Sequence, residues 1–281
     1  MNIALIGPGA IGSTLAFQLS RTGHQVTVVA RGERLRLLET EQAIIRTDGE
    51  RAAVTVCAQL DPAVAYDLVL VTVLATQVDA VLPSLKASGA RKVMFLFNTF
   101  DSIAPLREAV GAQRFSFGFP GGIFCLLLEG RIRPTIRAGT TVDDPQIAVL
   151  FEGAGIPTVV EPDMQSWLRT HAAMVAPMMS IGVIAHARRR GITWAEARTH
   201  AHALRAGFDL VHTMGNVWVP KSIGTLSRLP RVLQTLMLWA ASRTTVIREL
   251  GALGTTEPRM LIDMMTAARP ELAAPLVAIR P

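Results

Sequence analysis

The sequence predicts an α/β protein in which a doubly wound parallel sheet is followed by an all-α domain. A short apolar run at Asn2–Ile6 leads directly into a glycine-rich turn and then into a helical pattern. Apolar, β-branched runs alternate with helical stretches as far as residue 110, and this alternation is typical of a parallel sheet. Beyond Asp163 the strand patterns fade and helical patterns continue.

The glycine-rich turn has the spacing of a dinucleotide-binding motif. Gly7, Gly9 and Gly12 follow G-x-G-x-x-G, and Ile11 and Leu15 begin the helical pattern behind them. The three glycines suit a tight turn, close approach of a pyrophosphate to the backbone, and close helix–strand packing. The alternative is a glycine-rich turn between unrelated elements. We predict a Rossmann-type domain whose cofactor contacts the turn residues Gly7, Pro8, Gly9, Ala10, Ile11 and Gly12.

The end of the second strand, Gln25–Ala30, indicates which dinucleotide is bound. An NAD enzyme usually has an acidic residue there for the ribose 2′-hydroxyl. This chain has Arg31, with Arg34 close behind, and its nearby acid, Glu33, comes slightly late. A guanidinium can bind a 2′-phosphate bidentately. We therefore predict NADP(H) held by Arg31 and Arg34, against the alternative of solvated arginines at a helix start.

The remaining elements of the first domain follow from apolar periodicity and turn residues. A helix is expected at 33–42, and strands at 43–46 and 53–56 flank an Asp-Gly turn. Further strands are expected at 67–73 and 92–97, with helices at 77–88 and 103–110. Doubly wound sheets bind ligands at the carboxyl ends of their strands. This rule selects Thr72–Gln77 and Asn98–Ser102 as cleft-lining segments, with Thr72, Gln77 and Asn98 as cofactor contacts.

The pattern changes along the second half of the chain. Residues 117–122 are rich in turn formers and are expected to form a loop, with strands at 132–137 and 158–160. Helices are expected at 165–190, 194–214, 232–253 and 257–268. The predicted domains are therefore 1–162, which binds NADP, and 163–281, a helical substrate or dimerisation domain.

Charge and hydropathy exclude two classes of partner. The formal net charge is +6, but basic residues cluster only at Arg188–Arg190, the usual cationic end of a helix. Nucleic-acid binding needs basic residues gathered on one face with aromatics, so we expect no nucleic acid partner. The longest nearly apolar stretch, 172–185, is too short for a bilayer and contains Pro177, so no membrane partner is expected.

Cysteine usage and the first residues indicate the compartment. Cys57 and Cys125 are isolated and match no metal or redox spacing. They are expected to be buried thiols in a reducing environment. The chain begins with a strand pattern and not with a charged-then-apolar leader. We therefore expect a cytoplasmic protein without a metal site.

Taken together, these residues resemble the ketopantoate reductase (2-dehydropantoate 2-reductase) family. The resemblance includes the glycine turn, Arg31, the run Val71–Gln77, Asn98 and the pair Thr256-Glu257. It implies an N-terminal Rossmann domain, a helical C-terminal domain, an active site between them and NADPH as the cofactor. It also implies that Glu257 helps to hold the substrate and that Asn98 lies near the nicotinamide.

The resemblance has departures in the helical domain. Trp167 matches the family motif, but Arg169 stands where the family has its catalytic lysine. Ala173 and Pro177 stand where the family has asparagines. The chain therefore resembles a divergent member that lacks the catalytic lysine, which argues against ketopantoate itself as the substrate.

Reduction of a ketone by hydride leaves an alkoxide, which needs a proton donor and a stabilising charge. Arginine supplies charge but is a poor acid, whereas histidine can do both near neutral pH. We therefore predict His171 as the acid, with Arg169 as a possible ligand of a substrate carboxylate. The two residues are about 200° apart around an ideal helix, so both cannot face one site squarely. The alternative for His171 is a partly buried, hydrogen-bonded histidine between the domains.

Each remaining polar candidate has an ordinary structural alternative. Asn98 could form an Asx-type turn after a strand, and Gln77 could be an exposed residue at a helix start. Glu257 could serve in the first turn of a helix, where a negative charge favours the dipole. The predicted catalytic residues are His171, Asn98, Arg169 and Glu257.

The leading hypothesis for function is an NADPH-dependent reductase of a small 2-oxo acid or related carbonyl, related to ketopantoate reductase. The alternative is a non-catalytic NADP(H)-binding protein that senses redox state or serves a partner. A weaker alternative is an oxidoreductase that acts in the other direction on an alcohol or amine. The expected partners are a small-molecule carbonyl substrate and, in a homodimer, a second copy of the chain.

Overall fold

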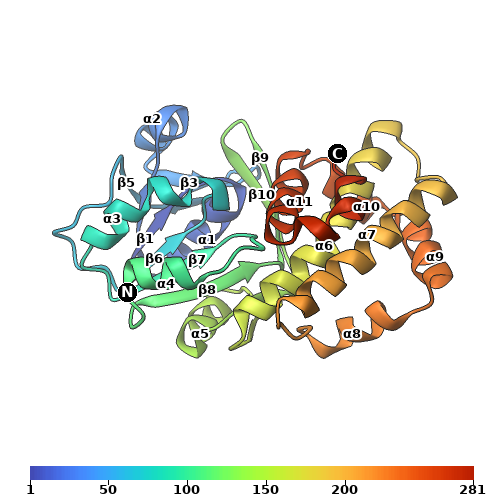
Figure 1. Ribbon diagram of the computed structural model, residues 1–281. Helices are drawn as coiled ribbons and strands as arrows, with labels where there is room; N and C mark the ends of the chain where they lie inside the picture. The colour runs from blue at the N-terminus through green and yellow to red at the C-terminus, as the bar shows by residue number, and fades with distance from the viewer. The chain divides into compact units, whose positions relative to one another are not determined.

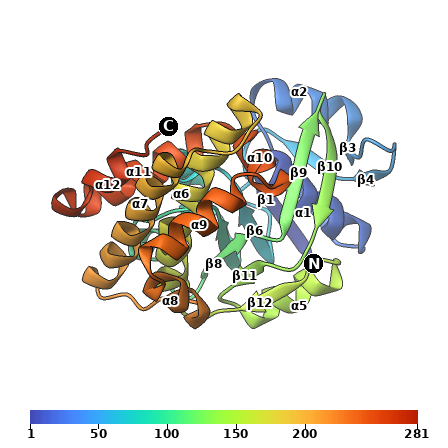
Figure 2. The ribbon, with the colours of Figure 1, turned by 90° about the vertical axis from the view of Figure 1, so that its right-hand side faces the viewer.

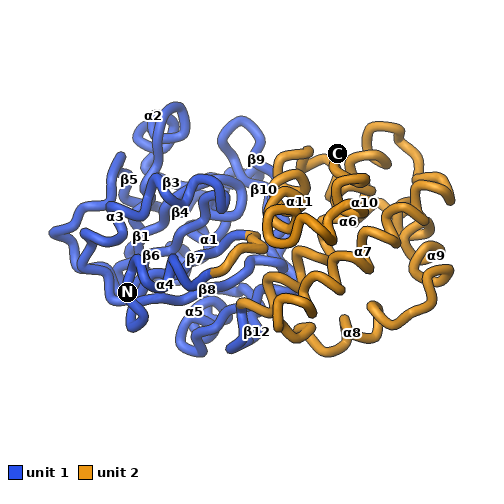
Figure 3. The backbone as a smooth tube through the Cα atoms, in the orientation of Figure 1, with its two compact units in different colours: residues 1–97, 103–164 blue, residues 98–102, 165–281 orange.

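A computed structural model describes residues 1–281 and divides into two compact units (Figure 3). Unit 1 comprises Met1–Phe97 and Ile103–Met164, and unit 2 comprises Asn98–Ser102 and Gln165–Pro281. The short segment Asn98–Ser102 leaves unit 1 after a strand and belongs to unit 2, and no sequence pattern marks this excursion. Residues that are neighbours along the chain therefore belong to different units here.

Unit 1 is built on an eight-stranded sheet, which confirms the predicted fold class. Its strands, in spatial order, are β12 (Thr158–Val160), β11 (Thr140–Val142), β8 (Phe115–Pro120), β7 (Lys92–Leu96), β6 (Leu68–Val71), β1 (Asn2–Ile6), β2 (Gln25–Val29) and β5 (Thr55–Cys57). All neighbouring pairs are parallel except β11 with β8. The central strand β1 pairs Ile3 with Val26 on one side and with Leu68 on the other.

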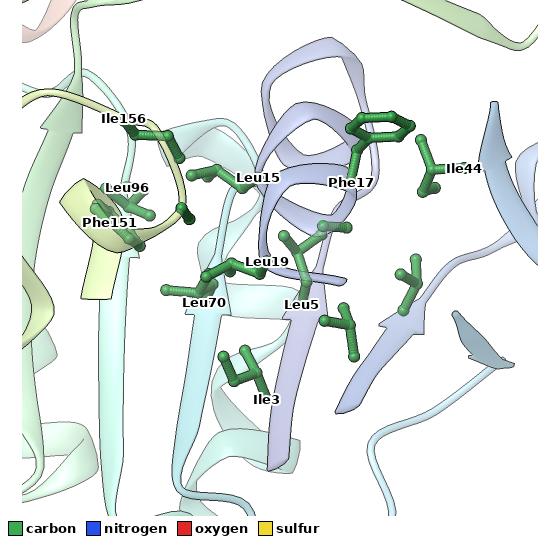
Figure 4. Close-up of a cluster of buried hydrophobic side chains, with 14 of the residues drawn as sticks. Ile3, Leu5, Leu15, Phe17, Leu19, Ile44, Leu70, Leu96, Phe151 and Ile156 are labelled. Atoms are coloured by element: carbon green, nitrogen blue, oxygen red, sulfur yellow. The ribbon is translucent and has the colours of Figure 1, made fainter. Parts of the chain in front are cut away.

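The central strands are apolar along their whole length because both faces of the sheet are covered. Alternate residues such as Ile3 and Leu5 of β1 point toward helix α1 (Ala10–Arg21), where they meet Leu15 and Leu19 (Figure 4). Phe151 of helix α5 (Pro145–Gly153) joins the same cluster. Full burial of such a side chain contributes about 1.5–3 kcal/mol, so this face holds the sheet and both helices together.

The other helices of unit 1 connect successive strands. They are α2 (Gly32–Glu41), the 3₁₀ helix η1 (Ala75–Ala80), α3 (Leu82–Ala87) and α4 (Ala104–Val110). A small hairpin of β3 (Ala43–Ile45) and β4 (Arg51–Ala53) lies outside the main sheet. The strand expected at 53–56 is divided, because β4 ends at Ala53 and β5 begins at Thr55 to join β2.

Residues 117–120 are strand, contrary to the loop expected at 117–122, and only 121–122 form a turn. They continue β8 to Pro120 and then turn into β9 (Ile123–Leu128), which pairs with β10 (Arg131–Ile136) as a long hairpin (Figure 2). The glycines that suggested a loop are required by close packing. A Cβ on Gly122 would lie 2.1 Å from the carbonyl oxygen of Arg137, and one on Gly121 would lie 2.7 Å from that of Gly139.

Unit 2 is helical, as predicted (Figure 1). Its helices are α6 (Met164–Arg188), α7 (Trp194–Thr213), α8 (Lys221–Arg228), α9 (Arg231–Ala241), α10 (Thr245–Gly251), α11 (Thr256–Ala268), η2 (Pro270–Leu272) and α12 (Ala274–Val277). The single helix expected at 232–253 is two helices. The helix is interrupted near Thr244, whose hydroxyl caps the N-terminus of α10 by accepting a hydrogen bond from the Ile247 amide.

Helix α6 is long and apolar enough, by length and composition, to cross a membrane. In the structure 61% of its apolar window is buried, as in the core helix of a globular unit. Pro177 lies within the helix and does not end it. This helix carries Trp167, Arg169 and His171 on its first turns.

Candidate functional site

The glycine turn between β1 and α1 has the geometry that a pyrophosphate needs. Gly7 has a φ of +92°, and a Cβ there would lie 2.8 Å from a side-chain carbon of Val73. A Cβ on Gly12 would lie 2.4 Å from the carbonyl oxygen of Gly7 and 2.4 Å from Thr72 Oγ1. A Cβ on Gly9 would meet nothing within 4 Å, so open space lies beside this residue alone of the three. Gly7 and Gly12 are needed for packing, and Gly9 leaves room for a ligand.

The N-terminus of α1 supplies hydrogen-bond donors at this space. The first amide to bond back into the helix is that of Ser13, which donates to Gly9 O at 2.9 Å. The amides of Ala10, Ile11 and Gly12 precede it and have no intrahelical acceptor. Together with the helix dipole they favour an anion. The turn therefore fits the phosphates of a dinucleotide, although the residues that contact it stay a prediction.

Two side chains hold the turn in place. Thr72, directly after β6, donates its hydroxyl to Gly7 O at 2.7 Å. Arg34 donates from Nε to Pro8 O at 3.0 Å, from Nη2 to Ser13 Oγ at 2.9 Å and from Nη1 to Gly130 O at 2.8 Å. Burial lowers the pKa of Arg34. Both residues thus brace the glycine turn, and Arg34 in addition ties it to the tip of the β9–β10 hairpin.

Arg31 differs from Arg34 in being exposed. It is the N-cap residue of α2, has extended backbone geometry and makes no side-chain capping bond. The residue after β2 is the buried Ala30, which carries no carboxylate. Of the two arginines, Arg31 is the one whose guanidinium is available to a 2′-phosphate.

The side chain of Gln77 makes a local hydrogen bond in the structure. It is exposed, and its Oε1 accepts a hydrogen bond at 3.3 Å from the amide of Leu74, the N-cap of η1. This geometry is that of the alternative, an exposed residue at a helix start. Gln77 is therefore not part of the proposed site.

Asn98 and Glu257 form a hydrogen-bonded pair within unit 2. Asn98 is 5% exposed, and its Nδ2 donates to Glu257 Oε1 at 3.1 Å. The Oδ1 atom of Asn98 is buried and has no hydrogen-bond partner. Burial raises the pKa of Glu257, and the bond from Asn98 lowers it in part. An unpaired acceptor beside a carboxyl with a raised pKa is the arrangement of a polar binding site.

Arg169 is tied into unit 2 by contacts that sequence patterns did not reveal. Its Nε donates to Phe100 O at 3.1 Å and its Nη1 to Asn216 Oδ1 at 2.6 Å. Asn216 in turn donates to Ser166 Oγ at 3.0 Å. Asn216 lies between helices α7 and α8 in a segment without a motif, so no sequence signal could have identified it. The position of Arg169 is fixed by this network.

His171 lies one half-turn further along α6. Its imidazole stacks on Trp167 with ring centroids 4.9 Å apart and planes 8° apart. Desolvation lowers the pKa of His171 to about 4. The ring is therefore neutral at pH 7, which disfavours the prediction that His171 protonates an alkoxide.

Fold and site together define the class as a two-unit protein with an N-terminal Rossmann-type dinucleotide fold and a helical second unit. Residues 3–133 match the family model described as ketopantoate reductase PanE/ApbA. This match covers most of unit 1 and the segment Asn98–Ser102 of unit 2. It includes the glycine turn, Arg31 and Asn98, and supports the resemblance to that family.

Two curated relatives each match a little over a third of the chain. The 2-dehydropantoate 2-reductase of Vibrio cholerae is 37% identical over 113 residues, which are 39% of this chain and 36% of that protein. The enzyme of the same name from Bacillus subtilis is 32% identical over 109 residues, 38% of this chain and 36% of that protein. The matched segments thus span about a third of these relatives.

Solved structures extend the likeness in fold to the whole chain. A PanE/ApbA family ketopantoate reductase from Ralstonia eutropha has a TM-score of 0.74 at 17% identity, covering 100% of this chain and 96% of that one. The dimeric ketopantoate reductase of Staphylococcus aureus has a TM-score of 0.68 at 14% identity, covering 100% and 96%. A D-mandelate dehydrogenase solved with NADH has a TM-score of 0.69 at 13% identity, covering 100% and 96%. These likenesses establish the fold of both units.

Proposed function

We propose that this protein is a ketopantoate reductase-like oxidoreductase that uses NADPH to reduce a small 2-oxo acid or related carbonyl. The observation that carries the proposal is the combination of the open space at Gly9 in unit 1 with the Asn98–Glu257 pair in unit 2. Asn98 stands two residues beyond the end of β7, and the carboxyl ends of parallel strands are where such sheets bind ligands.

The residues present fit a nicotinamide dinucleotide. The glycine turn and the amides of Ala10, Ile11 and Gly12 would hold the pyrophosphate. Arg31 would hold a 2′-phosphate, because its guanidinium is exposed and can bind that group bidentately. The D-mandelate dehydrogenase relative was solved with NADH, so the preference for NADPH depends on Arg31 alone. When bound, the cofactor supplies a hydride to the carbonyl carbon.

The chain's own residues would manage the proton and the substrate's orientation. Reduction leaves an alkoxide, which must gain one proton. Glu257 is the group in unit 2 best suited to give it, because burial favours its protonated form. The proton would pass from its carboxyl to the alkoxide, and the carboxylate would recover a proton from solvent. Asn98 would orient the carboxyl through Nδ2 and accept a ligand's hydrogen bond at the unpaired Oδ1.

Arg169 would have an electrostatic role in this scheme. Its guanidinium is held by Phe100 O and Asn216 Oδ1, which fixes its position, and it stays charged despite partial burial. A fixed positive charge suits the carboxylate of a 2-oxo acid. The resemblance places Arg169 at the position of the family lysine, so its high pKa is a further reason to assign the proton to Glu257.

Carbonyl-dependent NADPH oxidation tests the proposed function. Purified protein is mixed with NADPH or NADH and with a panel of 2-oxo acids that includes ketopantoate, and loss of the reduced nicotinamide is followed. NADPH should be consumed with at least one 2-oxo acid, and the Gly9→Val variant should consume none. A protein that binds NADPH and consumes none with any carbonyl would instead be the redox sensor. Activity only with 2-hydroxy acids and oxidised cofactor would indicate the opposite direction.

A homodimer in the cytoplasm is also part of the proposal. Helix α9 buries the polar Gln234 and Thr235 and exposes the apolar Val232, Leu233 and Leu236, the reverse of an ordinary surface helix. The S. aureus relative is described as dimeric, and a second copy would cover such a face. Light scattering should give twice the mass of one chain, and Leu236→Glu should give a monomer. A monomeric wild-type protein would refute this part.

A further inference from the structure

A cluster of arginines in unit 2 surrounds a cavity that is separate from the Asn98–Glu257 pair. The cavity has a volume of about 470 Å³ and is lined by Arg190, Gly191, Ile192, Thr193, Arg243 and Arg248. These residues come from the turn between α6 and α7 and from the end of α9 through α10. The lining contains three guanidinium groups and no carboxylate.

The two segments that form the cavity are pinned to each other. The amide of Ile192 donates to Ser242 Oγ at 3.1 Å, and Arg243 Nη2 donates to Ile192 O at 3.4 Å. Gly191 permits this approach, because a Cβ there would lie 2.7 Å from both Arg243 Cγ and Ser242 Oγ. The walls of the cavity are therefore built by specific contacts.

Arg243 is held in a defined orientation. Its guanidinium carbon lies 3.6 Å from the centre of the Trp239 ring, and its Nη1 also donates to Ser242 Oγ at 3.2 Å. Stacking and hydrogen bonding together fix a planar cation. Arg243 thus presents a pre-oriented positive charge at the cavity.

Arg248 has a side-chain nitrogen that finds no hydrogen-bond acceptor within the chain. Its Nε is buried and has no hydrogen-bond partner. The helix that carries it is fixed, because Gly251 packs against Gly182 of α6 so closely that a Cβ on Gly251 would lie 2.0 Å from the Gly182 carbonyl oxygen. A buried guanidinium nitrogen without an acceptor is costly and calls for an anion.

The acid at the start of α7 cannot supply that anion. Glu196, three residues beyond Thr193, is bound to Arg188 at 2.7 Å and accepts from the Thr193 amide at 2.8 Å. It closes the capping box at the start of α7. The positive charges of the cavity therefore stay without a neutralising partner from this acid.

We propose that the cavity formed by Arg190, Arg243 and Arg248 binds the phosphate group of a small phosphate monoester. Three guanidinium groups match a dianion better than a monocarboxylate, and arginine binds phosphate bidentately. The volume falls within the roughly 300–1,000 Å³ of ligand pockets and exceeds what a single phosphate fills, so an organic group is attached. The site is independent of the proposed reductase chemistry.

Calorimetric titration of the full chain tests the proposal with glycerol 3-phosphate, inorganic phosphate and glycerol as probes. Arg248→Met keeps the apolar stem and removes the charge. Arg190→Gln changes an exposed residue of the turn between α6 and α7. Arg198→Gln, exposed on α7 and outside the cavity, is the matched control. Glycerol 3-phosphate should bind more tightly than inorganic phosphate, and glycerol should not bind.

The dissociation constant for glycerol 3-phosphate should rise at least tenfold in Arg248→Met and severalfold in Arg190→Gln, and stay unchanged in Arg198→Gln. NADPH affinity should be the same in all four proteins, because the glycine turn lies in unit 1. Equal weakening in Arg198→Gln would show attraction to net charge and overturn the proposal. So would an absence of binding by the wild type, or binding that only Gly9→Val removes, which would place the phosphate at the glycine turn. If Arg248→Met does not fold, Arg190→Gln decides the outcome.

Discussion

Asn98 and Glu257 are 159 residues apart in the chain and are joined by a hydrogen bond of 3.1 Å from Nδ2 to Oε1. The bond favours the ionised carboxylate, whereas burial of Glu257 favours the neutral acid, and burial is the larger effect on its pKa. Asn98 therefore tunes a group that holds its proton to higher pH than an ordinary glutamate. This balance underlies the first two predictions.

Replacement of the proposed proton donor should slow turnover and remove one limb of the pH profile. In Glu257→Gln, kcat should fall about a hundredfold to ten-thousandfold, the usual contribution of general acid catalysis. Wild-type activity should decline as pH rises through the raised pKa of Glu257, because the donor must be protonated, and the variant should lack that decline. Glu249→Gln, at an exposed acid, is the control. Normal turnover in Glu257→Gln would exclude it as the donor.

Removal of the Asn98 amide should shift the same titration. Asn98→Ala deletes the donor that lowers the pKa of Glu257, so that pKa should rise and the alkaline limb should move to higher pH. Carbon-13 NMR titration of the Glu257 carboxyl, assigned by comparison with Glu257→Gln, measures the pKa directly and without substrate. An unchanged carboxyl titration would mean that the hydrogen bond does not tune Glu257.

The low pKa of His171 predicts a dependence of stability on pH. The folded-state pKa of about 4 lies below the ordinary 6.5, so the unfolded chain binds the proton more readily. The free energy of unfolding is unaffected by this group above pH 6.5 and decreases as pH falls from 6.5 toward 4, by at most about 3.4 kcal/mol at 1.36 kcal/mol per unit. Denaturant unfolding at pH 7 and pH 4.5 should show a smaller loss in His171→Gln. Equal losses in both proteins would contradict the low pKa.

Substitution of two glycines in the same turn should have different effects, one on cofactor binding and the other on stability. A Cβ on Gly9 meets no atom within 4 Å, so Gly9→Val should fold and lose NADPH binding, because the new side chain occupies the pyrophosphate space. Gly12→Ala places a Cβ 2.4 Å from Gly7 O and should destabilise the fold by about 1–3 kcal/mol. Gly153→Ala, which also meets nothing within 4 Å, controls for the added carbon. A folded Gly9→Val protein that retains NADPH would remove the dinucleotide site.

Cofactor preference should depend on Arg31. Arg31→Ala should weaken NADPH binding by about 1.5–3 kcal/mol, as expected for loss of a charge-assisted hydrogen bond, and leave NADH binding almost unchanged. Fluorescence titration with both cofactors measures the difference. Arg36→Ala, exposed on the same helix, is the control for net charge. A loss of equal size for both cofactors would show that Arg31 serves the structure of α2.

The sequence by itself determined the parts of the fold that depend on local pattern. The run Asn2–Ile6, the glycine turn and the helix after it follow from apolar period and glycine spacing, and the structure places β1 and α1 there. The same reasoning located β7 and β12, and the change to helices beyond residue 163. In each of these elements the apolar residues follow a strand or helix pattern within the segment. The pattern can therefore be recognised without knowing which other segments pack against it.

Tertiary structure alone decided what depends on contacts between distant residues. The sequence placed a loop at 117–122, whereas Gly121 and Gly122 are packed against the backbone of Gly139 and Arg137, and β8 continues to Pro120. Arg34, which is expected at a phosphate, also braces Pro8 and Gly130, contacts that no local pattern indicates. His171 was expected to be an acid near neutral pH, but desolvation, which no local pattern encodes, holds its pKa at about 4. Packing and desolvation arise only when the chain has folded, because they depend on which distant segments surround each group.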